Sequence, residues 1–286
     1  DFYLVDIFRV VGGKDHAKFM HSHFGRITTQ GLSLKPAEDF GHGTQMRQFQ
    51  TDPAPQPGWS VDWAIEDRYK YLKEIPGGID LHLRYTDLTS DAQAYTCEGW
   101  ITTGGYDTEV EAWIPRVMTR RSNTTSPLAS TFVAVIEPYR KTSGIAAIRR
   151  LPLQTATGQP FGDPDVAIEI SLQGGARHLF IAADAAKQSG ATPSFNNGDN
   201  LIQADWQVRL DGEMCLIRRD KAGRIYSIAL CRSRRLGVGD IEIKLKDLTD
   251  FVEIRFEDGR AQVVAGDKQS VADISFQSAV GESRLK

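Results

Sequence analysis

Short strand-like runs recur along the whole chain, and this pattern constrains the fold more than any other feature. Each run is rich in β-branched and aromatic residues, alternates apolar with polar positions, and ends near Gly, Pro, Asn or Asp. Long helical periodicity is almost absent, and only Ala182 to Gln188 is a helix candidate. We therefore predict an all-β fold of stacked antiparallel sheets. The predicted strands are Ser60–Ile65, Ile79–Tyr85, Ala94–Thr102, Thr131–Glu137, Val166–Leu172, Leu201–Leu210, Glu213–Arg218, Ile225–Cys231, Ile241–Leu245 and Phe251–Phe256.

A polar, turn-rich segment from Leu151 to Asp165 divides the chain into two halves of strand-like sequence. Segments of this composition commonly connect domains. We expect a large antiparallel β-sandwich over residues 1–152 and a smaller C-terminal β-sandwich over residues 153–286. The sequence has no internal repeat of fixed period, which argues against a propeller or a solenoid.

The charge balance excludes one class of partner. The 286 residues include 34 Lys and Arg against 37 Asp and Glu, a formal net charge of −3. A domain that binds nucleic acid usually carries a basic excess, so we predict no nucleic-acid partner, and any other polyanion must bind at a local basic patch. Because no stretch approaches the ~18 consecutive apolar residues of a membrane span, we predict no membrane partner.

Three of the six histidines lie within eight positions, at His16, His21 and His23. A hairpin that turns at Gly12 and Gly13 would set Asp6 opposite His21, with their Cβ atoms about 5 Å apart. Such a pair supplies two ligands of a zinc-type site and needs a third from elsewhere. The alternative is an ordinary hydrogen-bonded contact between neighbouring strands.

The other two histidines have different alternatives. His23 shares a strand face with His21, so it is available as a ligand or as a substrate contact. His16 lies near the predicted turn and is most simply an exposed loop residue.

Two of the three cysteines fall on predicted neighbouring strands. A hairpin that turns at Ala222 and Gly223 sets Cys215 nearly opposite Cys231. A cross-strand disulfide and two buried thiols both fit this placement.

Two blocks of sequence resemble a known family, the heparinase II/III-like polysaccharide lyases. The first block comprises Tyr3 to Val10, the Gly12-Gly13 turn, His16 and Phe19 to Ser22, and the second is Leu128 to Tyr139. The resemblance covers about the first half of the chain. It implies antiparallel β-sheet domains that follow an N-terminal α/α toroid of helices. This chain would be the β-sheet part alone, and we expect a piece of a longer protein because the sequence begins inside a strand-like run.

The resemblance also implies an activity, β-elimination at a uronic acid, and a Zn2+ or similar divalent ion in the β-domain. Asp6 matches the family's metal-binding Asp, and His21 matches the His on the next strand. The zinc would orient nearby loops rather than act as a Lewis acid. The family's principal acid/base Tyr, and the residue that neutralises the substrate carboxylate, come from the toroid. His16 is the best remaining catalytic candidate in this chain.

An acidic polysaccharide substrate requires basic residues along its groove. Arg116, Arg120 and Arg121 lie next to Trp113 and form the best local candidate. Arginine binds carboxylate or sulfate through paired donors, and tryptophan offers a face for sugar stacking. An ordinary surface strand explains this cluster equally well. His82 with Arg84 is a weaker second candidate.

The leading hypothesis is thus the β-sheet portion of a polysaccharide lyase that cleaves uronic-acid-containing polysaccharide. Its expected partners are the acidic polysaccharide and the toroid of the same protein, and its expected location is secreted or periplasmic in a bacterium. The alternative is a non-catalytic carbohydrate-binding or structural β-sandwich module. A third hypothesis, an extracellular adhesion module, predicts no affinity for uronates.

Overall fold

The computed structural model describes residues 2–39, 44–68, 80–102, 111–124, 127–184, 201–266, 268–278 and 281–285. The predicted fold class is confirmed, because 67% of the residues are in strands and these strands form stacked antiparallel sheets. The described residues contain no α-helix. They therefore include no helix that is long and apolar enough to cross a membrane. The helix candidate begins at Ala182, which instead ends a strand, while its residues 185–188 lie outside the described part.

The chain divides into two compact units, Asp1–Gly144 and Ile145–Lys286. This boundary lies before the predicted position between residues 152 and 153. The turn-rich segment is not a linker, because Leu153 is buried in the core of the second unit. The backbone N–H of Gln154 also donates to Ile202 O at 3.0 Å, which ties this segment to a strand of the same unit.

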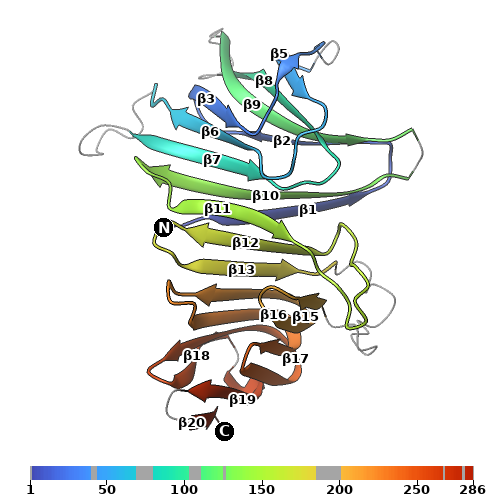
Figure 1. The fold of residues 1–286 in the computed structure, drawn as a ribbon. Helices are drawn as coiled ribbons and strands as arrows, with labels where there is room; N and C mark the ends of the chain where they lie inside the picture. The colour runs from blue at the N-terminus through green and yellow to red at the C-terminus, as the bar shows by residue number, and fades with distance from the viewer. Residues whose placement is uncertain are drawn as a thin grey trace. The chain divides into compact units, whose positions relative to one another are not determined.

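The first unit is built from two antiparallel sheets of five strands each among the described residues (Figure 1). Sheet A has the order β1 (Leu4–Val11), β10 (Ala129–Arg140), β7 (Leu81–Asp87), β6 (Ser60–Ile65) and β3 (Gly25–Gln30). Sheet B has the order β2 (Asp15–His21), β9 (Glu111–Ser122), β8 (Gln93–Thr102), β5 (Met46–Asp52) and β4 (Lys35–Pro36).

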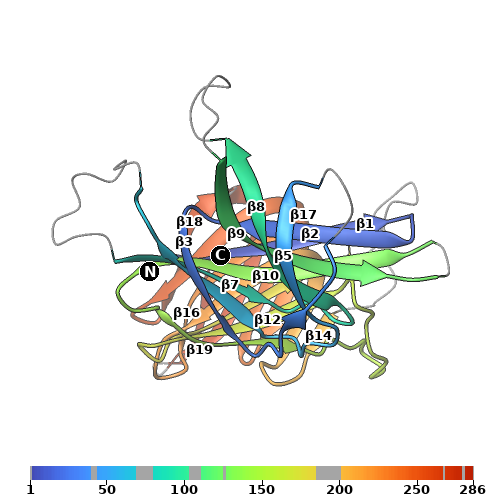
Figure 2. The same cartoon turned by 90° about the horizontal axis from the view of Figure 1, so that it is seen from above.

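The two sheets pack face to face around one apolar core. Val61, Trp63 and Tyr85 enter this core from sheet A, and Ala94 and Val117 enter it from sheet B. Because side chains alternate between the faces of a strand, their sequence neighbours lie on the outer faces of the sandwich. In Figure 2 the sheet B strands β8 and β9 run across β7 and β10 of sheet A.

The predicted hairpin between the first two strands is wrong. Strand β1 pairs with β10 in sheet A, where Asp6 lies opposite Ala134, and β2 pairs with β9 in sheet B, where His21 lies opposite Arg116. The Gly12-Gly13 turn therefore carries the chain from one sheet to the other. Both glycines have a positive φ, 111° and 67°, a conformation that favours glycine.

The second unit is a single antiparallel sheet of ten strands among the residues described. Its path runs through β11 (Ile145–Leu151), β12 (Val166–Leu172), β13 (Arg177–Ala182), β15 (Val208–Arg219), β16 (Ile225–Val238), β17 (Ile241–Glu257), β19 (Val271–Ser278) and β20 (Gly281–Leu285). Two further strands lie off this path, β14 (Leu201–Gln203) beside β15 and β18 (Arg260–Gly266) beside β17.

This sheet folds over on itself. Arg219, the last residue of β15, donates to the carbonyl of Trp206 at 3.2 Å, although Trp206 lies just before the same strand begins. The register shifts at Gly212 in β15 and after Ser233 in β16, where the bend occurs. Gly212 has no room for a side chain, because a Cβ there would lie 2.0 Å from Ser233 Oγ. The two arms enclose one continuous core.

The cross-strand disulfide is not formed. Cys215 lies opposite Leu230, and Cys231 lies opposite Met214, so the two cysteines are offset by one residue and face opposite sides of the sheet. Both thiols are free. Cys215 is fully buried, which raises the pKa of its thiol to about 12.

Candidate functional site

Asp6 and His21, the predicted zinc ligands, are not brought together as a cross-strand pair. The Asp6 carboxylate instead meets Lys18 Nζ at 2.6 Å, in a charge contact that lacks hydrogen-bond angles. His21 is exposed, and its Nδ1 lies 3.0 Å from the carbonyl oxygen of Ser22. No group of three or more His, Cys, Asp or Glu side chains in the described ranges is placed to hold a metal ion. The described residues therefore do not fit the predicted zinc site.

His16, the predicted catalytic residue, is buried rather than exposed in a loop. Its Nδ1 lies 2.9 Å from Ser130 Oγ, and its Nε2 is hydrogen-bonded to the carbonyl of Gly12. Both ring nitrogens are thus used to fix the connection from β1 to β2 against the start of β10. This arrangement gives His16 a structural role.

His23 contributes to a pocket of about 300 Å³ in the first unit. Its Nδ1 accepts a hydrogen bond from the backbone N–H of Phe24 at 2.8 Å. The pocket walls are mainly apolar, which suits an acidic sugar poorly. The lining residues include Ile65, Leu81, His82, Leu83 and Pro138.

The predicted arginines do not share one face of β9. Arg120 holds Asp15 through two hydrogen bonds, from Nε at 2.8 Å and from Nη2 at 2.5 Å. This pairing lowers the pKa of the Asp15 carboxyl and raises that of Arg120. Arg121 follows directly in the strand, opposite His16, and so lies on the other face. Arg120 is a paired surface residue rather than a free anion binder.

Trp113 does not offer an open ring for a sugar. The guanidinium of Arg47 lies 3.9 Å from the centroid of the Trp113 ring. Arg47 is itself fixed by Glu98, which accepts from its Nε at 2.9 Å. One face of the Trp113 ring is therefore covered by a planar cation.

Arg116 has no acidic partner among the described residues, whereas Arg120 is paired with Asp15. Its Nε is buried and has no hydrogen-bond partner there. Directly opposite lies the exposed His21 of the edge strand β2, with the Phe19 ring 6.0 Å from the guanidinium. The structure thus brings together one predicted substrate residue and one predicted metal ligand, in a different pairing from the predicted one.

The surroundings of Arg116 keep its guanidinium in place without neutralising it. Its Cζ lies against Gly99, where a Cβ would come within 2.8 Å. The neighbouring Cys97 is buried, which raises the pKa of its thiol to about 11 despite the charge of Arg116, so the thiol stays neutral. Glu98 is paired with Arg47, and Asp39 accepts from the backbone N–H of Phe49. Arg116 is thus a partly buried cation beside the edge strand β2 of sheet B.

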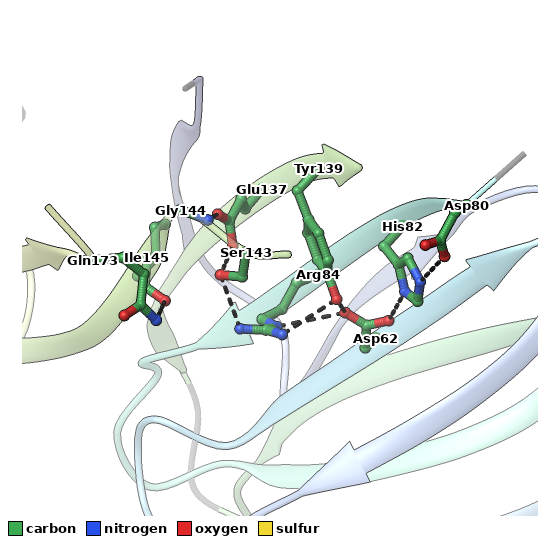
Figure 3. Close-up of polar contacts among 10 residues, drawn as sticks. All are labelled: Asp62, Asp80, His82, Arg84, Glu137, Tyr139, Ser143, Gly144, Ile145 and Gln173. Atoms are coloured by element: carbon green, nitrogen blue, oxygen red, sulfur yellow. Dashed lines mark hydrogen bonds and ion pairs between the residues drawn. The ribbon is translucent and has the colours of Figure 1, made fainter. Parts of the chain in front are cut away.

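A polar network of several charged and hydroxyl side chains lies on the outer face of sheet A (Figure 3). Asp62 lies opposite Arg84, and His82 lies opposite Tyr139, so all four side chains share that face. The Asp62 carboxylate accepts from His82 Nδ1 at 2.6 Å and from the Tyr139 hydroxyl. Burial, followed by the Asp62 contact, raises the pKa of Tyr139 to about 12.

This network is satisfied by its own members. Arg84 donates to the Tyr139 hydroxyl at 3.2 Å and to Ser143 Oγ at 3.2 Å, and Ser143 donates in turn to the buried Glu137 at 2.7 Å. His82 also has Asp80 beside its Nε2 at 3.3 Å. Three carboxylates face one guanidinium, so the network does not attract an acidic sugar, and its effect is to join β6, β7 and β10.

The sequence indicated His82 and Arg84 but not Asp62 or Tyr139. Strand alternation alone puts His82 and Arg84 on one face. Finding Asp62 and Tyr139 requires the register between strands that are far apart in the chain, which no local pattern contains. Gly99 is a similar case, because its role depends on its neighbour Arg116.

No protein-family model matches this chain, and no curated protein matches it.

Proposed function

We propose that this chain is the β-sheet part of a polysaccharide lyase that acts on uronic-acid-containing polysaccharide by β-elimination, and that it binds the acidic polymer. The observation that carries the proposal is Arg116, a partly buried guanidinium with no acidic partner among the described residues, opposite the exposed His21. The all-β architecture of stacked sheets is what the sequence resemblance implies for such a part.

The chemistry of a uronate explains why this pair matters. The C5 proton of a uronate becomes acidic enough to remove only when the adjacent carboxylate is neutralised. Arg116 offers its outer nitrogens to that carboxylate, and His21 lies beside it on the neighbouring strand, within reach of the sugar hydroxyl groups. Phe19 lies beside both and gives the sugar ring an apolar surface.

In this proposal the chain binds and orients substrate, and the proton transfers come from the α/α toroid of the same protein. His16 takes no part in them, because both of its ring nitrogens are used within the fold. Zinc also has no part in the proposal, since Asp6 is ion-paired with Lys18. The proposed location is secreted or periplasmic, where such a polymer is found.

Calorimetric titration of the chain with a polyuronate tests the binding site. We expect Arg116→Gln to weaken binding about tenfold, the effect of losing one charge-assisted contact. Gly99→Ala should weaken binding without changing any charge, because its Cβ would lie 2.8 Å from Arg116 Cζ and displace the guanidinium. Arg26→Gln, at an exposed arginine of β3, serves as the matched control and should leave the affinity unchanged. Equal affinity in all three variants would remove Arg116 from the site.

A second candidate function is a non-catalytic module that binds acidic carbohydrate. The internal hydrogen bonds of His16 favour it, because they leave the predicted catalytic side chain unavailable. The two candidates differ in their product. Incubation of the full-length protein with a polyuronate gives an ultraviolet-absorbing unsaturated uronate if it is a lyase, whereas binding with no such product supports the module.

A further inference from the structure

In the second unit, three arginines gather around a single carboxylate. Glu169 on β12 is buried, with 4% of its side chain exposed, and accepts from Arg149 at 2.8 Å and also from Arg177. The indole N–H of the fully buried Trp206 donates to the same carboxylate at 2.7 Å. Burial opposes ionisation of Glu169, but these donors outweigh it and hold its pKa below the usual value.

The third arginine, Arg219, does not reach this carboxylate. It lies on β15 directly opposite Arg177 on β13, and its guanidinium lies 4.2 Å from the centroid of the Trp206 ring. It donates to the Trp206 carbonyl at 3.2 Å. Its Nε is buried without a hydrogen-bond partner, and no carboxylate of the described residues forms an ion pair with it.

The charges at this place do not balance. Like charges directly opposite on neighbouring strands repel one another. Arg149 and Arg177 hold the one carboxylate and Arg219 lies beside them without an acid of its own, so three guanidinium groups and one carboxylate leave a formal excess of two positive charges at a partly buried position. The pKa of Arg219 is accordingly lowered, by burial first and by the charge of Arg177 second. An anion next to Arg219 would supply the missing negative charge.

Arg219 also forms part of the wall of a groove of about 850 Å³ in the second unit. Two aromatic side chains, Tyr226 and Phe256, line the same groove. Three turn glycines, which have no side chain, also line it. These glycines are Gly223, Gly239 and Gly259, all with positive φ. The volume is within the range of sites that hold small organic ligands, about 300–1,000 Å³.

The acidic residues of the rim limit what can bind. Asp220 is already used, since it accepts from the backbone N–H groups of Ala222 and Arg224 and from the Arg224 side chain. Asp240 and Asp258 lie at exposed turn positions, and Glu257 is exposed at the end of β17. Carboxylates there repel a run of negative charges but accept hydrogen bonds from sugar hydroxyl groups. The lining therefore suits a ligand with one anionic group and several hydroxyl groups.

We propose that this groove is a binding site for an acidic sugar, with its carboxylate or sulfate on Arg219 and its ring against Phe256 and Tyr226. The site is separate from Arg116, because it belongs to the other unit of the chain. The choice of a sugar acid as the ligand rests on the proposed function. The inference of an anion site rests only on the charges around Arg219.

Calorimetric titration with glucuronate, glucose and inorganic sulfate tests this site on the Arg116→Gln chain, in which the first site is disabled. We expect saturable binding of glucuronate, no binding of glucose, and at least about tenfold weaker binding of glucuronate after Arg219→Met, which keeps the apolar stem over Trp206. Arg232→Met is the control at an arginine outside the groove that is already paired with Glu213, and it should change the affinity less than about twofold.

A second variant separates loss of binding from loss of folding. Arg219→Lys keeps the charge, so it should retain part of the affinity for glucuronate while its circular dichroism matches that of the parent chain. Binding of glucuronate that is unchanged in Arg219→Met would overturn the site. Binding of sulfate without glucuronate would overturn the sugar part of the proposal. If the polyuronate titration shows no role for Arg116, the glucuronate titration of Arg219 still tests this groove. The two proposals can therefore be refuted independently.

Discussion

The hydroxyl of Tyr139 donates its hydrogen bond to the carboxylate of Asp62 across the intervening strand β7. This contact joins β10 to β6, which share no backbone hydrogen bonds in sheet A. Because the contact needs the hydroxyl hydrogen, it is lost when Tyr139 is deprotonated.

The first prediction concerns high pH. Folding raises the pKa of Tyr139 from 10.0 to about 12, so the folded state binds this proton more tightly than the unfolded state does. Its contribution to stability is complete below the unfolded pKa and is lost as pH rises through the folded one. The free energy of unfolding, measured in urea, should therefore fall between about pH 10 and pH 12. Tyr139→Phe should reduce this fall, and an identical pH profile in the variant would contradict the prediction.

The second prediction concerns Asp87, a fully buried carboxyl between the two sheets of the first unit. It accepts from Tyr85 at 2.6 Å, from Thr119 at 2.8 Å and from the backbone N–H of Thr89 at 2.8 Å. Tyr85→Phe should lower the free energy of unfolding by about 2 kcal/mol at neutral pH, the usual effect of losing a hydrogen bond to a charged group.

Burial raises the pKa of Asp87 above its usual value, so its contribution to stability is present at acid pH and is lost as pH rises through the folded pKa. The loss caused by Tyr85→Phe should consequently shrink as pH is lowered and the carboxyl becomes neutral. Thr119→Val removes a second donor from the same carboxyl and should show the same trend. A loss that does not vary with pH in either variant would show that the carboxyl does not titrate as expected.

The third prediction separates an ion pair from a metal site. Asp6→Asn leaves Lys18, whose side chain is 13% exposed, without its acid, and should lower the free energy of unfolding by about 2 kcal/mol. His21→Ala changes an exposed residue and should alter stability by less than about 0.5 kcal/mol. If both residues bind zinc instead, the two variants would lose similar stability and a chelator would reproduce the loss in the parent chain.

The fourth prediction concerns the bend of the second unit. Gly212→Ala would place a Cβ 2.0 Å from Ser233 Oγ and 2.7 Å from Ser233 Cα. Because the obstacle includes backbone, we expect a loss of at least about 3 kcal/mol, at the upper end for overpacked positions. Gly174→Ala, where a Cβ would meet nothing within 4 Å, is the matched control and should be close to neutral in thermal unfolding.

Local patterns in the sequence located most strands well. The predicted ranges Ser60–Ile65 and Val166–Leu172 coincide with β6 and β12. Two predicted strands, Ile241–Leu245 and Phe251–Phe256, are parts of the single long strand β17. The predicted Leu201–Leu210 is interrupted by a turn before Val208. Alternation and turn residues report these features because both depend only on neighbours in sequence.

Strand pairing was predicted less well, for a physical reason. The Gly12-Gly13 turn has the same local sequence signal whether the next strand pairs with the first or crosses to another sheet. The choice depends on β10, whose Ala134 pairs with Asp6 from far along the chain. Because β1 pairs with β10, Asp6 and His21 are not opposite each other as predicted. Because β2 pairs with β9, His21 lies opposite Arg116 instead.

The pairing of β1 with β10 also sets when the first unit can form. Leu4 lies opposite Ile136, so the first strand acquires its only neighbour in sheet A among the described strands after nearly all of this unit has been synthesised. Until then its apolar positions have no sheet to join, and the entropy of closing so long a loop delays the pairing. The opening strand of this unit is therefore among the last to find its partner during synthesis, and until then its unpaired edges are open to association with other incomplete chains.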